Sequence, residues 1–421
     1  MTVSAGDGRS LVVLVAPDSF KGSLTSVEVA RALAAGWARA RPRDEILLAP
    51  LADGGEGTTV AIEAAGGWTW RVADATDPIG RAISARWLQS DDRTQAIIEL
   101  AAASGLSRLA STELDPLGAT TRGTGELIVA ALDAGVREIT LGIGGSATND
   151  GGAGILRALG ATISAPGPDP ATVDLDGLDP RLGEVRFRIA CDVTNPLLGP
   201  SGAAATYGPQ KGATVEDVAE LDRRLADFAD ALEAATGRRE RDAPGAGAAG
   251  GTGFGLLCLR ERFAALELVP GIAVVMEAAD FDGKLGRAGL VITGEGRIDA
   301  QTAFGKTALG VARRAAVAGV PCIAVGGGVE PEGIAALRPL GVVVVPVVER
   351  PQTVAEAMAA GPEPLERCGE RIARLVALVE RPKRRVPGLD KVILHADFDD
   401  PIPEFDPDSM HPEDPMQELL K

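Results

Sequence analysis

The sequence predicts an α/β fold in which a second α/β domain is inserted into a parallel-sheet domain, and three observations support this prediction. Short apolar runs, such as residues 11–16 and 289–293, have the composition of strands that are covered on both faces. A polar, glycine-containing segment follows each run, and a helical pattern follows several of these segments. In the middle of the chain a hairpin pattern replaces this alternation. The expected parts are a discontinuous parallel-sheet domain of residues 1–75 and 285–380, an inserted domain of residues 76–284, and a tail of residues 381–421.

The parallel-sheet domain begins with two repeats of strand, loop and helix. The first strand ends at Pro17, and a helix that runs to Ala40 opens at Thr25, where Glu28 completes the spacing of a capping box. The other expected elements are strands at 46–51, 289–293, 321–325 and 342–345, with helices at 58–65 and from about 307. Because binding sites on parallel sheets lie at the carboxyl ends of the strands, one rim is expected to carry the loops 17–23, 53–58 and 294–299.

The inserted domain mixes hairpin and crossover signals. Residues 83–88 and 94–100 resemble two strands joined at Asp91-Asp92-Arg93, which predicts a hairpin. Strands at 138–143 and 185–190 and helices at 153–159 and 215–235 are expected to follow. Residues 238–255 are first charged and then rich in glycine and alanine, so they predict a flexible connection or a mobile binding loop.

A glycine-rich stretch, residues 142–152, lies where the strand 138–143 passes into the helix 153–159. Glycines let backbone N–H groups approach an anion, and a helix start adds unpaired N–H groups and the positive end of its dipole. A tight turn that needs glycine only for its geometry is the alternative, although such a turn does not require eleven residues of this composition. The stretch therefore predicts phosphate or carboxylate binding by Gly144, Gly145, Ser146, Asn149 and Asp150.

Two nucleotide-binding patterns are incomplete. Residues 245–250 match GxGxxG, but a charged segment precedes them where a dinucleotide fingerprint requires a strand. Gly305-Lys306-Thr307 is half of a Walker A motif, because Ala300 stands where its first glycine would be. Neither pattern therefore identifies a cofactor.

Composition excludes several classes of function. A net charge of −17 and an isoelectric point near 4.7 disfavour nucleic acid and anionic membranes as partners. No apolar run approaches the roughly 20 residues of a membrane span, and no secretory signal is recognisable, so a cytoplasmic location is expected. The two histidines, His395 and His411, lie in the tail, so catalysis is expected to depend on Asp, Glu, Lys, Arg and backbone amides.

The tail has the composition of a disordered segment. Residues 396–421 hold nine acidic residues against one lysine, and the segment from Pro387 to Pro415 contains six prolines, these two included. Phenylalanines alternate with acids from Asp397 to Phe405, so a segment that wraps a partner is the alternative.

Four motifs in this order resemble those of the bacterial type-1 glycerate kinases. They are Ala16-Pro17-Asp18-Ser19-Phe20-Lys21-Gly22-Ser23, Leu51-Ala52-Asp53-Gly54-Gly55-Glu56-Gly57-Thr58, residues 144–152, and Thr293-Gly294-Glu295-Gly296-Arg297-Ile298-Asp299. The resemblance covers roughly residues 10–380 and leaves out the tail. It implies ATP-dependent phosphorylation of glycerate with magnesium, commonly to 2-phosphoglycerate. It also implies a flavodoxin-like domain with an inserted domain that is restriction-enzyme-like and has a mixed sheet.

The residue types in the loops suit phosphoryl transfer, which requires neutralised anions and an aligned acceptor hydroxyl. Lys21 and Lys211 are candidates for phosphate contacts, with surface lysines as the alternative. Arg122 is a candidate for the substrate carboxylate, with a structural ion pair as the alternative. Asp192 is a candidate base or metal ligand, with a helix or turn cap as the alternative. Lys21, Arg122 and Asp192 form the expected catalytic set.

The remaining candidates are expected to bind substrate, phosphate or metal. The substrate and phosphate set adds Asp18, Ser19, Asp53, Glu56, Gly294, Glu295 and Gly296 to Lys211 and the residues of the glycine-rich stretch. Asp192 and Asp299 are expected to contact magnesium. A dinucleotide-dependent oxidoreductase and a non-enzymatic small-molecule binding protein are the alternative functions. The sequence leaves open whether the product is 2- or 3-phosphoglycerate and whether the protein is a homodimer.

Overall fold

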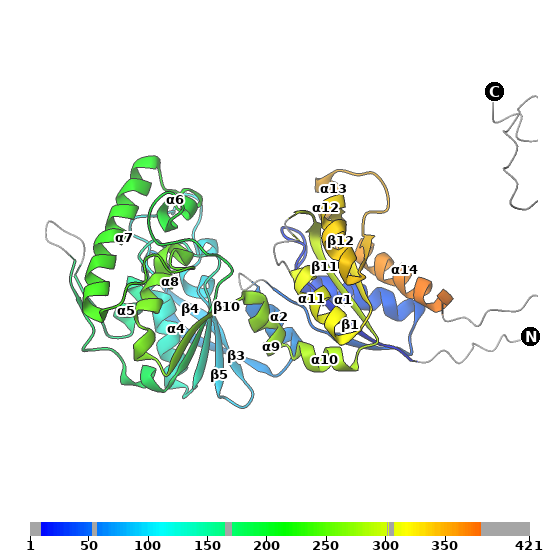
Figure 1. The fold of residues 1–421 in the computed structure, drawn as a ribbon, viewed down its shortest axis with the longest axis horizontal. Coiled ribbons are helices and arrows are strands. Elements are labelled where there is room, and N and C mark those ends of the chain that lie inside the picture. Colours follow the sequence, from blue (N-terminus) through cyan, green and yellow to red (C-terminus); the bar gives the residue numbers. More distant parts are fainter. Residues whose placement is uncertain (1–9, 53–56, 165–170, 301, 303–306, 380–421) are drawn as a thin grey trace, which may run out of the picture. The chain divides into compact units, whose positions relative to one another are not determined.

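The structure is a computed structural model that describes residues 10–52, 57–164, 171–300, 302 and 307–379. The chain divides into a compact unit of residues 7–378 and a second unit made of the two chain ends, and the description that follows concerns the first unit. This unit contains a five-stranded sheet and a six-stranded sheet (Figure 1). Among the described residues no helix is long and apolar enough to cross a membrane.

The five-stranded sheet is entirely parallel, as the sequence predicts. Its order is β2 (Glu45–Leu48), β1 (Val12–Pro17), β11 (Leu290–Ile298), β12 (Cys322–Val329) and β13 (Val343–Pro346). Numbered along the chain within this sheet, the order is 2-1-3-4-5, which is that of flavodoxin-like folds. The strand order reverses between β1 and β11, and ligands of open α/β sheets bind at the carboxyl ends of such strands.

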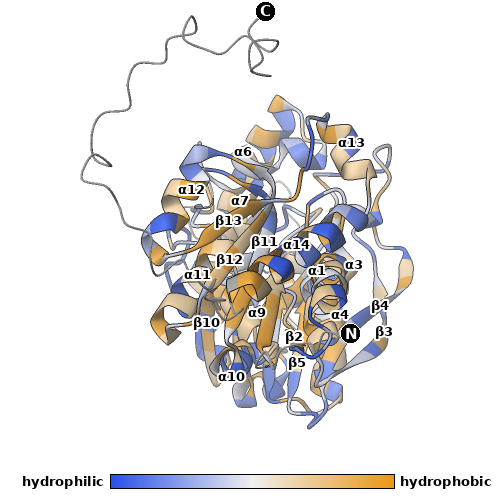
Figure 2. Ribbon diagram, turned by 90° about the vertical axis from the view of Figure 1, so that its right-hand side faces the viewer, coloured by the Kyte–Doolittle hydropathy of each residue, from blue (hydrophilic) through white to orange (hydrophobic). Residues whose placement is uncertain are grey.

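Helices cover both faces of this sheet because its strands are apolar on both faces; Figure 2 colours the apolar residues orange. One face packs on α1 (Ser26–Ala40) and α14 (Glu363–Val379), and the other on α10 (Phe281–Arg287), α11 (Thr307–Ala318) and α12 (Pro331–Leu337). The predicted capping box of α1 is confirmed, with Thr25 and Glu28 exchanging hydrogen bonds. The short helix α13 (Val354–Ala359) precedes α14.

The six-stranded sheet is mixed. Its order is β10 (Ala265–Val269), β9 (Arg186–Ala190), β6 (Glu138–Gly142), β5 (Gln95–Glu99), β4 (Ala82–Ser90) and β3 (Trp68–Thr76). The first four strands are parallel, and β5, β4 and β3 are antiparallel, which confirms the predicted hairpin. Strand β3 belongs to this sheet although most of it precedes the expected boundary at residue 76. A two-stranded ribbon, β7 (Thr162–Ile163) and β8 (Val173–Asp174), stands apart from both sheets.

Two layers of helices flank the six-stranded sheet. One core unites its strands with α3 (Ala101–Ser104), α4 (Arg122–Asp133), α5 (Ala153–Ala158), α6 (Ala203–Tyr207), α7 (Val215–Thr236) and α8 (Ala248–Cys258). The opposite face of β4 and β5, at Leu88 and Ile97, packs against α2 (Thr58–Ala65) and α9 (Gly271–Ala278). These two helices lie on the two connections that lead from one sheet to the other, β2 to β3 and β10 to β11.

Two expectations about loops are wrong. Residues 294–298 do not form a loop, because β11 continues to Ile298 and pairs with an equally extended β12. Glycine permits this close pairing: a Cβ at Gly294 would lie 2.6 Å from the carbonyl oxygen of Val325, and one at Gly327 would lie 2.6 Å from that of Gly296. Residues 238–255 are not a flexible connection either, since their glycine-rich part is buried and α8 begins within it.

Candidate active site

Asp18 lies at the point where the strand order of the five-stranded sheet reverses. It directly follows β1, and its backbone N donates to the carbonyl oxygen of Gly294 in β11 over 2.8 Å. The carboxylate is buried, and its Oδ2 accepts a hydrogen bond from Thr307 Oγ1 at 2.6 Å. Asp18 therefore links β1 to the first residue of α11 at the edge where ligands of such sheets bind.

The turn after Asp18 places Lys21 on the surface. Phe20 N donates to the carbonyl oxygen of Leu24 over 2.8 Å, which closes the turn, and Lys21 at its tip is exposed. Phe20 is buried against the extended part of β11 and β12, where a Cβ at Gly296 would lie 3.2 Å from Phe20 Cα. Gly296 thus lets the turn approach the sheet, whereas Gly294 lies against Val325 of β12, and Ser19 lies half-buried beside the turn.

Glu295 and Asp299 belong to the end of β11 and the turn that follows. Glu295 is buried, and its Oε1 accepts a hydrogen bond from Thr302 Oγ1 at 2.8 Å. Thr302 Oγ1 in turn accepts one from Asp299 N at 3.2 Å, and Arg297 Nε lies 3.6 Å from Asp299 Oδ2. Two further candidates, Asp53 and Glu56, lie outside the described residues.

The glycine-rich stretch forms the turn between β6 and α5, as predicted. The Asp150 carboxylate accepts hydrogen bonds from backbone and threonine groups at the starts of two helices. The donors are Thr120 Oγ1, Thr121 N, Thr121 Oγ1, Gly152 N and Gly154 N, at 2.8–3.3 Å. Because Thr121 precedes α4 and Gly152 precedes α5, Asp150 ties the two helices together. Ser146 and Asn149 of the same turn are buried.

Lys211 lies beneath this turn rather than on the surface. Its side chain is fully buried, and Nζ donates to Thr148 O at 2.6 Å and to Ser146 Oγ at 3.0 Å. Asn149 Oδ1 accepts a longer bond of 3.5 Å. Desolvation lowers the pKa of Lys211 to about 7, and the nearby charge of Asp150 opposes this shift. The ammonium group therefore stabilises the shape of the turn from inside the protein.

Arg122 forms an ion pair and Asp192 caps a helix, which are the structural alternatives to their expected catalytic roles. Arg122, at the first position of α4, is exposed, and its Nε lies 2.9 Å from Glu126 Oε1. Asp192 follows β9 and is exposed, and its Oδ1 accepts a hydrogen bond from Gly271 N, the first residue of α9, at 3.0 Å. These contacts orient the two side chains and leave their proposed chemical roles as hypotheses.

A second glycine-rich segment packs against the turn and explains the GxGxxG pattern. A Cβ at Gly250 would lie 1.9 Å from Thr148 O, and one at Gly247 would lie 2.2 Å from Pro196 O. Gly250 also has a φ of +66°, which an L side chain rarely adopts. The glycines of this segment are therefore required for close backbone contact with the loops that follow β6 and β9.

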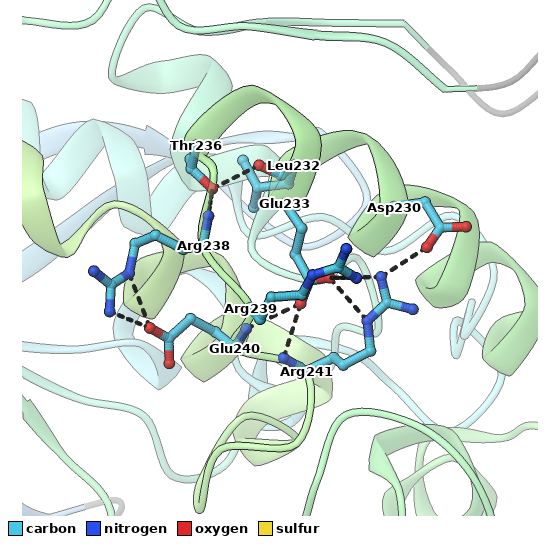
Figure 3. Close-up of polar contacts among 8 residues, drawn as sticks. All are labelled: Asp230, Leu232, Glu233, Thr236, Arg238, Arg239, Glu240 and Arg241. Atoms are coloured by element: carbon cyan, nitrogen blue, oxygen red, sulfur yellow. Dashed lines mark hydrogen bonds and ion pairs between the residues drawn. The ribbon is translucent and has the colours of Figure 1, made fainter.

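An ion-pair cluster fixes the chain just before that segment (Figure 3). The buried Glu233 carboxylate near the end of α7 accepts from Glu240 N at 2.9 Å, Arg241 N at 3.1 Å and Arg241 Nη2 at 2.7 Å. Arg238 pairs with Glu240 in the same cluster. Since Arg241 O accepts from Leu197 N at 2.9 Å, the cluster also connects to the loop after β9.

The structure thus forms two groups from the predicted residues. Asp18, Ser19, Glu295 and Asp299 gather around the ends of β1 and β11, whereas Ser146, Asn149, Asp150 and Lys211 form the turn after β6, with Arg122 next to it through Thr121. Within the described ranges no three His, Cys, Asp or Glu side chains come close enough together to hold a metal ion. The sequence analysis did not identify Glu99, whose Oε1 accepts a hydrogen bond from Thr59 N, or Thr307, whose Oγ1 donates to Asp18. The available signals were an acid at a strand end and a threonine at a helix start.

The five-stranded sheet is flavodoxin-like and has a buried carboxylate, Asp18, where its strand order reverses. The six-stranded sheet carries a glycine-rich strand-to-helix turn. These features are typical of α/β enzymes that act on small anionic molecules. The particular family follows from comparison with known proteins. The sequence model that describes the glycerate kinase family matches residues 13–377. The chain therefore belongs to this family. It is therefore a kinase.

Individual relatives agree with this assignment. A glycerate kinase of Halalkalibacterium halodurans is 43% identical over 373 residues, which cover 86% of this chain and 97% of that protein. The glycerate 2-kinase of Escherichia coli is 44% identical over 326 residues, covering 75% and 84%. The crystal structure of a putative glycerate kinase 2 from Salmonella typhimurium LT2 superposes with a TM-score of 0.76 at 40% identity, covering 88% of this chain and all of the other.

Proposed function

We propose that this protein transfers the γ-phosphoryl group of ATP to a hydroxyl group of D-glycerate and yields 2-phosphoglycerate. The family match that spans both sheets carries the proposal, because it includes the motifs at the ends of β1, β6 and β11. The name of the Escherichia coli relative, a glycerate 2-kinase, favours the 2-phosphate over the 3-phosphate. These matches do not support the dinucleotide-dependent oxidoreductase or the passive binding protein.

Anion binding is the first requirement of the reaction, because ATP and glycerate are both negatively charged and the chain has a net charge of −17. We assign phosphate contacts to the backbone N–H groups of the turn 144–150 and to the exposed ammonium group of Lys21. Lys211 contributes from beneath by holding the turn in shape. The exposed guanidinium group of Arg122 is assigned to the glycerate carboxylate.

Proton transfer from the acceptor hydroxyl is assigned to Asp192. Its carboxylate is exposed at the end of β9, and the hydrogen bond from Gly271 N holds one oxygen in a fixed orientation. Asp18, which follows β1, and Glu295, which lies within β11, belong to the other sheet, and they are assigned to hydroxyl groups of the substrates together with Asp53 and Glu56. In this hypothesis substrates engage residues from both sheets.

Magnesium is assigned to the phosphates of the nucleotide and to one or two carboxylates, Asp192 and Asp299. Mg²⁺ in kinases keeps several waters and takes most other ligands from substrate phosphates, so it needs no cage built from protein alone. The donor set fits this requirement, because Asp192 after β9 and Asp299 after β11 each offer a single carboxylate. When bound, the ion would neutralise charge on the transferring phosphoryl group.

The proposed activity is tested by mixing the full chain with ATP, Mg²⁺ and D-glycerate and by following ADP release. ADP is expected only when all three are present, and ³¹P NMR is expected to show the phosphate on the 2-hydroxyl. A reaction without D-glycerate is the control for ATP hydrolysis. Absence of glycerate-dependent ADP, together with protection against thermal unfolding by NAD(H), would contradict the proposal. We further infer a cytoplasmic enzyme with small-molecule substrates and no nucleic-acid or membrane partner.

A further inference from the structure

The first turn of α2 has no cap of its own. Its N-cap residue is Gly57, at a φ of +93°, and glycine has no side chain that could accept a hydrogen bond from the helix. Glu99, which is 40 residues after Thr59 and lies at the end of β5, supplies the missing acceptor instead. One oxygen, Oε1, accepts from Thr59 N at 2.7 Å and from Thr59 Oγ1 at 2.9 Å.

This contact is buried and reinforced by packing. Glu99 is 9% exposed and Thr59 5%, so both bonds are shielded from water. The negative charge faces the positive end of the helix dipole, which favours the arrangement. Ile62 of α2 packs with Leu88 and Ile97 in one core cluster, so the helix is bound to the six-stranded sheet at its side as well as at its start.

Glu99 also lies at the edge that carries the candidate site. In the sheet register it is opposite Gly142, and Gly142 is opposite Ala190. The glycine-rich turn leaves the sheet one residue after Gly142, and Asp192 follows two residues after Ala190. One edge therefore carries the turn, Asp192 with its bond to α9, and Glu99 with its bonds to α2.

We propose that Glu99 is a positioning residue for the kinase reaction: its two hydrogen bonds to Thr59 hold the start of α2 at the carboxyl edge of the six-stranded sheet, next to the glycine-rich turn. Glu99 acts through α2 and takes no part in the chemical step. This inference rests on the proposed kinase function only for its kinetic readout.

The first experiment compares Glu99→Ala with Glu99→Gln in the full chain. The alanine variant removes the acceptor, and kcat/KM for D-glycerate is expected to fall roughly tenfold to a hundredfold, the scale of a small misplacement of reacting groups. The glutamine variant keeps an oxygen that accepts both bonds, so most of the activity is expected to return. Asp217→Ala is the matched control, because Asp217 Oδ2 likewise accepts from the N and Oγ1 of one threonine, Thr214, both at 2.9 Å, but caps α7.

Thr59→Val provides a second variant that removes only the hydroxyl donor. If Glu99 acts through Thr59, the double variant Glu99→Ala/Thr59→Val is expected to lose no more activity than Glu99→Ala alone. Wild-type kinetics in Glu99→Ala, an equal loss in Glu99→Gln, or additive losses in the double variant would each overturn the proposal.

Amide hydrogen exchange separates this inference from the proposed function. Exchange in the peptide that contains residues 57–62 is expected to accelerate in Glu99→Ala, to remain slow in Glu99→Gln, and to be unaffected in Asp217→Ala. This measurement needs no substrate. If the wild-type chain turned over no glycerate, the proposed function would fail while the exchange data still decided whether Glu99 holds α2. Unchanged exchange in Glu99→Ala would overturn the inference by itself.

Discussion

A lysine ammonium group that is buried among neutral oxygen atoms loses its hydration, and the cost is lower if the group gives up its proton. Lys211 is in this position beneath the glycine-rich turn, where its Nζ bonds to Thr148 O and Ser146 Oγ. Burial therefore lowers the pKa of this lysine from 10.5 to about 7. The residue contributes both geometry and a titration close to neutral pH.

The stability of the protein is expected to depend on pH through Lys211. Between pH 7 and 10.5 the unfolded chain binds a proton that the folded protein lacks, so the free energy of unfolding rises with pH by up to about 1.4 kcal/mol per unit. Below about pH 7 both states are protonated and this gain is lost. Urea unfolding of wild type and Lys211→Met at pH 7 and pH 9 measures the effect: wild type is expected to gain stability relative to the variant. A pH-independent difference would contradict the lowered pKa.

Carboxylates at the edges of the sheets share one physical role. Asp18, Glu99, Asp150 and Asp192 each accept hydrogen bonds from groups at or next to the start of a helix. Negative groups are stabilised at helix N-termini, where backbone N–H groups lack partners within the helix. An acid that follows a strand in this fold therefore has a structural reason to be present, and a catalytic role needs separate evidence.

At the scale of elements, the segment before and within α8 shows how glycine sets the distance between loops. Residues Ala249, Gly250 and Gly251 have φ values of +52°, +66° and +88°, which interrupt the helix geometry. The segment lies against Thr148 in the turn after β6 and against Pro196 after β9. The Glu233 and Arg241 cluster then fixes its N-terminal end (Figure 3).

Gly250→Ala is expected to destabilise the protein by at least about 2 kcal/mol, because a Cβ there adds a positive-φ penalty to a clash with Thr148 O at 1.9 Å. Gly286→Ala is the matched control: no atom lies within 4 Å of its Cβ position, and alanine favours the helix α10. Urea unfolding gives the difference in stability, and kinetics at a temperature where both variants are folded report on the turn. Wild-type stability in Gly250→Ala would show that the segment can move away from the turn.

At the scale of the whole molecule, one chain builds two sheets and crosses between them twice. The first helix on each crossing, α2 or α9, starts at a carboxylate at the edge of the six-stranded sheet, Glu99 or Asp192 respectively. The last described helix, α14, completes a core of the five-stranded sheet through Leu365, Cys368 and Ile372. The family match ends at residue 377, within this helix.

Deleting residues 386–421 is expected to leave the kinase folded and active, because the apolar residues of α14 that fill the core all precede the deletion. The expected change in kcat/KM is less than about twofold, in line with the small effect of altering residues outside the core and site. Circular dichroism and glycerate-dependent ADP release check fold and activity in the same preparation. A folded but inactive truncation would place the acidic segment in the active site or in an essential subunit contact.

Much of the fold could be predicted from sequence because its signals are local. Apolar runs gave the parallel strands, the capping box at Thr25 gave the start of α1, and residues 91–93 gave the turn of the hairpin. The strand order, and the membership of β3 in the six-stranded sheet, were not predictable in this way, since strand pairing joins residues that are distant in the chain. For the candidate site, the sequence located the loops but not the direction of each side chain.

The sequence by itself therefore determined the order of elements, the interruption of the parallel sheet and the position of the glycine-rich turn between β6 and α5. Only the tertiary structure decided that residues 294–298 extend a strand, that Lys211 points inward to Thr148, 63 residues away, and that Glu99 holds α2. The physical reason is the range of the interactions. Helix and strand patterns repeat within a few residues, whereas a buried ammonium group or carboxylate takes its partners from whichever segment the fold brings beside it.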